Sequence, residues 1–285
     1  MTLLSPELMS RLESLQLHSR HRLVGKFGGE HSSKRYGNTV DFADFREYNP
    51  GDDFRRIDYH VLARLDQVLV KLYEADDEVT IRFLLDTSDS MASEGKLDHA
   101  KRIAAALGFI ALSSHDSVSV HTFPEHGTSP RFAGRAGIPA LFSYLESLAA
   151  EGTTPFARAA GHLLSRAGPP GITIVISDLL TPEWPALIGL RSAGSDLTIM
   201  HLLADGDISP DLAGDLMLVD REDGERLTVS VTEDILETFT TRVSDWKEQI
   251  RSKTLGVGGA YIALTPDSDI EDLIVGSWRE TGVLR

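Results

Sequence analysis

Short runs of apolar residues alternate with longer segments of helical periodicity through most of the chain. The apolar runs have the length of buried strands and occupy residues 79–85, 117–123, 172–176, 197–203 and 260–264. The segments between them have apolar residues at helical spacing and occupy residues 96–113, 138–150, 155–167, 182–192 and 232–253. Strands that are buried on both faces give continuous apolar runs, and parallel strands are usually connected by helices. The pattern therefore predicts an α/β fold in which helices cover both faces of a doubly wound parallel sheet.

A different pattern precedes this alternation. Ser5 and Pro6 fit a helix cap and a first helical turn, and leucines follow at helical spacing, which predicts an opening helix within residues 6–23. Residues 68–73 alternate between apolar and polar side chains, which predicts a strand.

These patterns divide the chain into two parts. We expect an N-terminal extension over residues 1–78 and a sheet domain over residues 79–285. Short alternating stretches around an Asp-Gly pair predict a surface hairpin near residues 215–231, and a C-terminal helix is expected to close the domain.

The composition excludes several classes of function. The chain has 43 Asp and Glu residues against 28 Lys and Arg residues, so its net charge is -15 and its surface should repel nucleic-acid phosphates. It has no cysteine, which excludes disulfides, thiolate nucleophiles and cysteine-ligated metals, and which fits a reducing compartment. The ten histidines show no zinc-site spacing, so a metal would be held mainly by oxygen ligands.

The sequence gives no sign of membrane insertion. Its first residues lack a basic region followed by an apolar run, and the longest apolar stretch, residues 103–112, is shorter than the roughly 18 residues that a membrane helix needs. We expect a cytoplasmic protein.

Oxygen-bearing side chains follow the first strand of the predicted sheet. Asp86, Ser88 and Ser90 occupy alternate positions of the loop directly after an apolar run. In open α/β sheets ligands bind beyond the carboxyl ends of the strands, and alternate loop residues there can point at one place. Carboxylates and hydroxyls are the ligands that Mg²⁺ and Mn²⁺ prefer. The other interpretation is a capped helix start that binds no metal.

Two more predicted loops bring ligands to the same edge of the sheet. Asp178 follows the strand expected at residues 172–176, and Thr153 precedes the helix expected at residues 155–167. Thr154 is an alternative ligand to Thr153. The metal-ion-dependent adhesion site of the von Willebrand factor A fold is similar in residue type, order and separation to the set Asp86, Ser88, Ser90, Thr153 and Asp178.

The chain as a whole resembles the von Willebrand A-like proteins catalogued as domain of unknown function 58. The most specific resemblance is a signature ahead of the sheet, which begins at Asp41-Phe42, continues with Pro-Gly-Asp-Asp-Phe-Arg-Arg-Ile-Asp-Tyr at residues 50–59 and ends at Ala63-Arg64. Asp41 and Tyr59 stand where this family usually has Glu and Trp.

The resemblance implies a fold and a function. It implies a von Willebrand A-like sheet of the Rossmann type and a non-enzymatic, metal-dependent protein-binding module with bound Mg²⁺ or Mn²⁺. The implied partner is a MoxR-type AAA+ ATPase or its client, which would present an Asp or Glu to an open metal position, so that the chain acts as an adaptor in protein maturation or remodelling. Many relatives have transmembrane helices ahead of the signature, and this sequence resembles the short soluble form.

Two rival hypotheses stay open at this point. The chain could be a metal-dependent phosphatase or hydrolase that uses Asp86, although no candidate general base is evident in the sequence. It could also be a structural module without a metal. The match of Ser93 and Lys96 to the Ser-x-x-Lys motif of penicillin-recognising enzymes is interpreted as chance, because the companion motifs are absent.

The charged residues of the signature have two interpretations. They could form a partner-recognition patch or a salt-bridged network that pins the extension to the sheet, and we favour the network. In that case Phe54 and Ile57 should face inward. The charged residues with these two interpretations are Asp52, Asp53, Arg55, Arg56, Asp58 and Arg64.

Overall fold

The computed structural model consists of two units. It describes residues 3–13, 15, 17, 40–52, 54–75, 79–124, 131–153, 155–165, 171–193, 195–221, 224–275 and 278. The smaller unit is Arg22–Glu78, and the larger unit combines Met1–His21 with Val79–Arg285.

A six-stranded sheet forms the centre of the larger unit. Its strand order is β10-β7-β6-β3-β4-β5, in which the first five strands are parallel and β5 pairs antiparallel with β4. The bounds of the strands are β3 Thr80–Asp86, β4 Ser117–Phe123, β5 Arg131–Ala133, β6 Gly171–Ser177, β7 Asp196–Leu202 and β10 Ala260–Leu264. The five strands predicted from the apolar runs are therefore confirmed, and the α/β class with them. The short strand β5 was not predicted.

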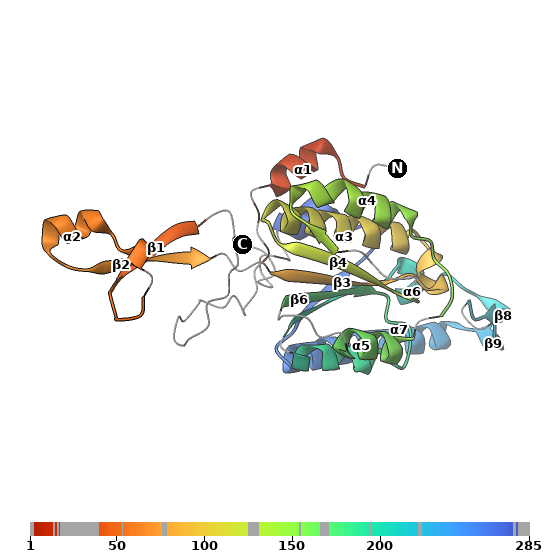
Figure 1. Ribbon diagram of the computed structural model, residues 1–285. Helices are drawn as coiled ribbons and strands as arrows, with labels where there is room; N and C mark the ends of the chain where they lie inside the picture. Colours follow the sequence, from red (N-terminus) through yellow and green to blue (C-terminus); the bar gives the residue numbers. More distant parts are fainter. Residues whose placement is uncertain are drawn as a thin grey trace. The chain divides into compact units, whose positions relative to one another are not determined.

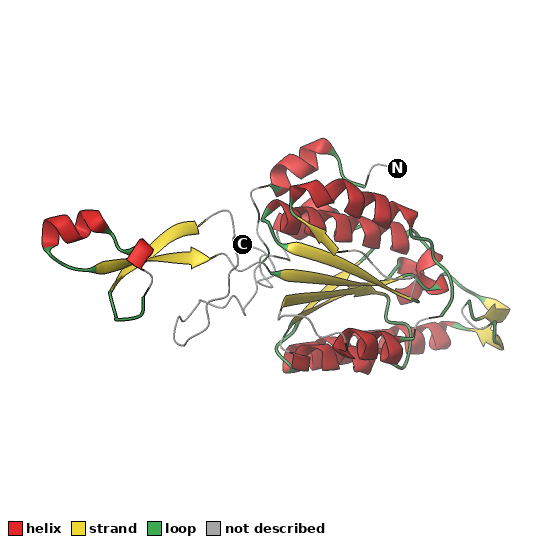
Figure 2. Ribbon diagram, in the orientation of Figure 1, coloured by secondary structure: helices red, strands yellow, loops and turns green. Residues whose placement is uncertain are grey.

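Helices cover both faces of this sheet (Figure 1; Figure 2). One face is covered by α3 (Lys96–Ser113), which packs beside α1 and α4 (Ile138–Ser147). The opposite face is covered by α5 (Phe156–Ser165), the 3₁₀ segment η4 (Trp184–Ala193) and the long helix α7 (Glu233–Gly256). The helix α8 (Ile270–Val275) follows β10. Within the described residues, no helix is both long and apolar enough to cross a membrane.

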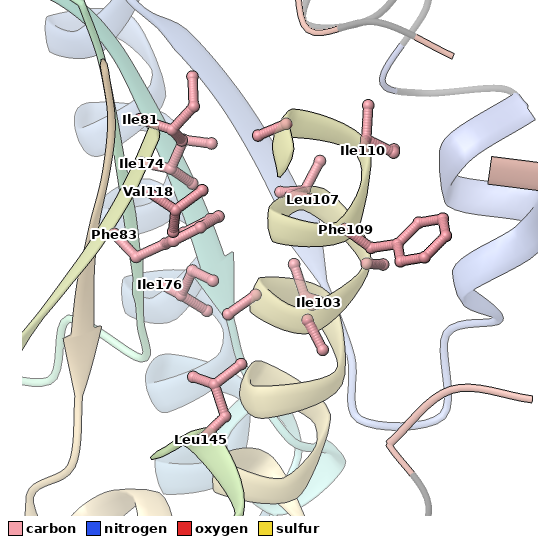
Figure 3. Close-up of a cluster of buried hydrophobic side chains, with 14 of the residues drawn as sticks. Ile81, Phe83, Ile103, Leu107, Phe109, Ile110, Val118, Leu145, Ile174 and Ile176 are labelled. Carbon is pink, nitrogen blue, oxygen red and sulfur yellow. The ribbon is translucent and has the colours of Figure 1, made fainter. Parts of the chain in front are cut away.

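The main hydrophobic core lies between the sheet and α3 (Figure 3). Phe83 on β3 and Ile103 on α3 are completely buried within it. Almost every residue of α3 is buried, the exceptions being Asp98 and Arg102, because α1 and α4 cover the side that the sheet does not. This burial explains the continuous apolar sequence in the second half of the helix, Ile103–Leu112.

The opening helix α1 (Pro6–Leu12) belongs to the larger unit. Ser5 caps it by accepting a hydrogen bond of 3.2 Å from Leu8 N, as the sequence predicted. Leu8 and Leu12 are buried in the same core as α3. The expected N-terminal extension over residues 1–78 therefore has two parts with different neighbours. The helix ends at Leu12 and residues 13, 15 and 17 are not helical, so the prediction of a longer helix is wrong there, while residues 18–23 lie outside the described residues.

The smaller unit contains a two-stranded antiparallel sheet. In it β1 (Val40–Glu47) pairs with β2 (Leu69–Ala75), and between them come the 3₁₀ turn η1 (Phe54–Arg56) and helix α2 (Tyr59–Leu65). The strand predicted at residues 68–73 is thus confirmed.

The signature segment in this unit differs from the expectation in one respect. Phe54 is 63% exposed and Ile57 is half-buried, so the prediction that Phe54 faces inward is wrong. The aromatic ring lies on a short 3₁₀ turn that leaves it in solvent. Among the charged residues, Asp52 pairs with Arg46 at 2.8 Å and Asp58 caps α2 through His60 N and Val61 N. Asp53 lies outside the described residues.

Several other elements of the larger unit differ from the prediction or extend it. The segment predicted as an α-helix at residues 182–192 is the 3₁₀ segment η4, so the prediction of an α-helix is wrong. Pro185, which would fall inside the predicted helix, lies in the first turn of η4, and Gly189 lies in its middle. The hairpin consists of β8 (Gly214–Val219) and β9 (Arg226–Val231), joined in antiparallel register. The one-turn helix α6 (Asp205–Ile208), which follows β7, was not predicted.

Candidate metal site

The loop after β3 gathers three of the predicted oxygen ligands. Asp86 is the last residue of β3 and is completely buried. Its Oδ1 accepts a hydrogen bond of 2.9 Å from Ser88 N, and the Oγ atoms of Ser88 and Ser90 lie 3.0 Å apart. Its Oδ2 accepts a hydrogen bond of 2.5 Å from Ser177 Oγ at the end of β6. The structure thus places one carboxylate and two hydroxyls close together where β3 ends.

The loop that contains Thr153 lies alongside this first loop. Glu151 N donates to Thr87 O at 2.8 Å, and Asp89 N donates to Gly152 O at 2.9 Å. These two backbone bonds join the loops directly at the candidate site. Thr153 itself is exposed to solvent, and Thr154 lies outside the described residues. The prediction of a threonine ligand from this loop stays a prediction.

Asp178 lies at the same edge of the sheet, because it follows β6, the neighbour of β3. It is almost completely buried and has a partner that the sequence did not reveal. Lys96, the first residue of α3, donates from Nζ to Asp178 Oδ2 at 2.8 Å. Leu180 N donates to Asp178 Oδ1 at 3.3 Å. Both carboxylate oxygens of Asp178 therefore accept hydrogen bonds from the protein.

The same lysine also binds a second carboxylate, that of Asp207. Lys96 Nζ donates to Asp207 Oδ2 at 2.9 Å, and that oxygen also accepts a bond of 3.0 Å from Ala204 N. Asp207 belongs to α6, so Lys96 connects the start of α3 to α6. A second link between the same segments is the hydrogen bond of 3.4 Å from Gly206 N to Glu94 Oε2.

The side chain of His201 holds the backbone carbonyl of Asp178 by a hydrogen bond. Its Nε2 lies 2.9 Å from Asp178 O, and its Nδ1 lies 2.8 Å from the hydroxyl of Tyr261. Burial lowers the pKa of His201 to about 4, so the ring is neutral at physiological pH. Nε2 then donates to the carbonyl and Nδ1 accepts from the tyrosine. His201 is in this way a structural support for the site.

The electrostatics of the site favour a bound cation. Burial and, next, the negative charge of Asp178 raise the pKa of Asp86, hydrogen bonds from Ser177 and Ser88 lower it, and the net result is a pKa of about 7. Three carboxylates, those of Asp86, Asp178 and Asp207, lie in this region with the single ammonium of Lys96. A divalent cation would relieve the repulsion that is left between the carboxylates.

The residues of this site lie inside a stretch that matches a known family. The family model described as "Protein of unknown function DUF58" matches residues 44–249, well over half of the chain. The chain belongs to the DUF58 family. The matched stretch of this DUF58 chain includes the signature segment 50–59 and every candidate ligand.

Mycobacterial proteins resemble this DUF58 chain over most of its length. "Uncharacterized protein Rv1480" of Mycobacterium tuberculosis and "Uncharacterized protein Mb1516" of Mycobacterium bovis are each 26% identical to it over 276 residues, which cover 93% of this chain and 86% of theirs.

Two solved structures are also similar, each covering 72% of this chain and 98% of its own, with TM-scores of 0.44. One is a conserved hypothetical protein BatB from Bacteroides thetaiotaomicron, at 17% identity. The other is an aerotolerance-related membrane protein from Bacteroides fragilis with multiple mutations to serines, at 19% identity.

The donor set of the DUF58 chain fits a hard divalent cation in part. Asp86, Ser88 and Ser90 offer oxygen atoms close together, as Mg²⁺ and Mn²⁺ require. Within the part of the chain that the structure describes, no cluster of three or more His, Asp or Glu side chains could hold a metal by itself. A metal here would therefore depend on the serine hydroxyls and on water. Asp178 fits less directly because its Oδ2 is already ion-paired with the ammonium of Lys96, whereas Asp86 accepts hydrogen bonds only from uncharged donors.

Sequence reasoning missed Lys96 and Asp207. In the sequence Lys96 stands out only as part of a chance motif match, and nothing singles out Asp207. No signal in the sequence showed that Lys96 needs a buried partner, because α3 begins with several other charged residues, Asp98, Lys101 and Arg102. Which carboxylate that partner is depends on the packing of strands far apart in the sequence.

Proposed function

We propose that this DUF58 chain is a metal-dependent protein-binding module of the von Willebrand A type. In this proposal Asp86, Ser88 and Ser90 hold one Mg²⁺ or Mn²⁺, and Thr153 and Asp178 complete its surroundings directly or through water. The observation that carries the proposal is the buried pair Asp86 and Asp178, which sits beside two hydroxyls at the carboxyl edge of the sheet. The metal would keep an exchangeable position for an acidic side chain of a partner.

The surroundings of the site suit a contact with another protein. Thr153 and Gly152 are exposed beside the candidate ligands, and Leu180, two residues after Asp178, is 48% exposed. An apolar side chain next to a partly open metal position would allow a partner to bury apolar surface around its bridging carboxylate. From the family resemblance, we propose a MoxR-type AAA+ ATPase or its client as that partner.

A hydrolytic function has less support. Both oxygens of Asp86 accept hydrogen bonds from the protein, and the side chain is fully buried, so a substrate would not reach it as a nucleophile. His201, a possible general base by residue type, is held between Asp178 and Tyr261. We therefore propose a binding role without turnover.

Partner capture with and without metal tests this function. The immobilised chain should retain a MoxR-type ATPase in Mg²⁺ and lose it in EDTA, and the double variant Asp86→Ala, Ser88→Ala should fail in both. Asp116→Asn is a matched control, because Asp116 is a buried aspartate that binds Val79 N at the start of β3, the opposite end from Asp86. Equal capture in EDTA and by the double variant would refute the metal bridge. Phosphatase activity that disappears with Asp86→Ala would favour the enzyme instead.

A further inference from the structure

A buried ammonium group lies within the candidate metal site. The side chain of Lys96 is only 1% exposed, and its Nζ lies 2.8 Å from Asp178 and 2.9 Å from Asp207. Burial by itself lowers the pKa of Lys96, but the charge of Asp178 and the hydrogen bonds to both carboxylates outweigh burial and raise the pKa above its usual value. Lys96 is therefore a resident cation at neutral pH.

Asp178 is the carboxylate that this ammonium would share with a metal. The charge of Asp178 acts on Asp86, the central metal ligand of the proposed function, because the two follow neighbouring strands. A divalent ion at Asp86 would consequently lie close to Asp178 and to the ammonium that Asp178 holds. Two cations at such close range repel each other strongly in a buried environment.

We propose that Lys96 is an internal cation that competes with a divalent metal for Asp178, and that metal binding leaves the ammonium paired with Asp207 alone. This inference rests on the proposed function of the same site. The geometry permits the exchange, because Lys96 has two carboxylate partners and keeps one when it leaves the other. The ammonium then remains paired, which avoids the large cost of an unpaired buried charge.

The exchange would connect the metal site to α6. Asp207 Oδ2 accepts bonds from both Lys96 Nζ and Ala204 N, so the position of the ammonium bears directly on the turn that begins α6. Asp207 is 18% exposed, whereas Asp178 is 1% exposed. Metal binding would in this way move a positive charge from the interior toward the surface segment Asp205–Ile208.

The test follows the lysine side chain itself. The full chain with ¹⁵N-labelled lysine is titrated with Mg²⁺ while the Nζ signals are recorded by NMR, and Mn²⁺ affinity is measured by calorimetry. The variants are Lys96→Met, Asp207→Asn and, as a matched control, Lys101→Met. Lys101 is a second buried lysine of α3. Its Nζ donates to Leu148 O at 2.6 Å and pairs with Asp98 at 3.7 Å, and neither partner belongs to the site.

The expected change in Mn²⁺ affinity has opposite signs in Lys96→Met and Asp207→Asn. Mg²⁺ should shift the Lys96 Nζ signal and leave that of Lys101 in place. Lys96→Met should bind Mn²⁺ about tenfold more tightly than the wild type, since about 1.4 kcal/mol of competition corresponds to that factor. Asp207→Asn should bind Mn²⁺ more weakly, because the displaced ammonium would lose its second partner. Lys101→Met should leave the affinity unchanged.

Other results separate this inference from the proposed function. Metal binding to the wild type with an unmoved Lys96 signal, and equal affinity in Lys96→Met, would overturn the competition and leave the metal site intact. If Mn²⁺ binds to the Lys96→Met variant and not to the wild type, the competition is supported and metal-dependent binding by the wild type is overturned. Failure of both chains to bind Mn²⁺ would overturn both proposals. If Lys96→Met does not fold, the Mg²⁺ titration of the wild type tests the competition by itself: a shifted Lys96 Nζ signal supports it, and an unmoved signal in a chain that binds Mg²⁺ overturns it.

Discussion

Asp86→Asn should stabilise the metal-free protein at pH 8, although it removes a central residue of the site. Burial and the nearby charge of Asp178 raise the pKa of Asp86 from 3.8 to about 7. The folded state therefore binds a proton more tightly than the unfolded state, so this group makes stability fall as the pH rises from about 4 to about 7. Above that window the ionised carboxylate destabilises the fold by a constant amount, and asparagine avoids this cost.

The size of the effect follows from the same shift. Three pKa units correspond to roughly 4 kcal/mol as an upper limit. This shift already includes the hydrogen bonds from Ser88 N and Ser177 Oγ to the carboxylate. Asparagine has one acceptor oxygen instead of two, so it can accept only one of these bonds, at a loss of roughly 2 kcal/mol. A net gain of roughly 1–2 kcal/mol at pH 8 remains, which would raise the melting temperature by about 2–8 °C.

Thermal and urea denaturation in EDTA, at pH 5 and pH 8, measure this change. The wild type should lose stability between these pH values relative to Asp86→Asn. With excess Mg²⁺ at pH 8 the order should reverse, because only the wild type gains stability from binding a ligand. The control Asp116→Asn, which lies at the other end of β3, should not stabilise the protein. Lower stability of Asp86→Asn in EDTA at pH 8 would refute the electrostatic reasoning.

Three other predictions concern packing and are measured by urea denaturation. Leu12→Ala should destabilise the larger unit by about 2–5 kcal/mol, because Leu12 is 1% exposed in the main core; a loss below 1 kcal/mol would mean that α1 does not pack there in solution. Phe54→Ala should change stability by less than about 0.5 kcal/mol, since the ring is 63% exposed; a large loss would show that the ring is covered. Gly171→Ala should destabilise the protein by about 1–3 kcal/mol, because a Cβ at this position would lie 2.2 Å from Thr80 O. The control is Gly189→Ala, since a Cβ at Gly189 meets nothing within 4 Å. Equal losses of stability in the two variants would contradict the close contact at Gly171.

The apolar pattern predicted the sheet well for a physical reason. Strands β3 and β6 are buried on both faces, so most of their side chains are apolar and their limits are visible in the sequence. The same reasoning failed for η4, whose apolar residues suggested an α-helix. Pro185 and Gly189 disfavour a regular α-helix, and the segment is a 3₁₀ helix packed against α5.

The candidate site could be predicted only in part. Asp86, Ser88 and Ser90 are near neighbours in the sequence, so their proximity follows from one loop. The partnership of Lys96 with Asp178 spans 82 positions and that with Asp207 spans 111, and both depend on how α3, β6 and β7 pack. Sequence spacing contains no information on such a contact, whereas the parallel order of β3 and β6 did predict that Asp86 and Asp178 share an edge.

The larger unit is discontinuous in the sequence, and this affects how the chain folds and how it can be shortened. Residues 22–78 are inserted between α1 and β3, so the ribosome releases Leu8 and Leu12 well before α3, which begins at Lys96. The apolar side of α1 has no native surface to pack on until α3 has been synthesised. A truncated chain that begins at Val79 would lack α1 and leave an apolar stripe of α3 in water, where such stripes promote aggregation. Shortened versions of this protein should therefore retain the opening helix and shorten the inserted unit instead.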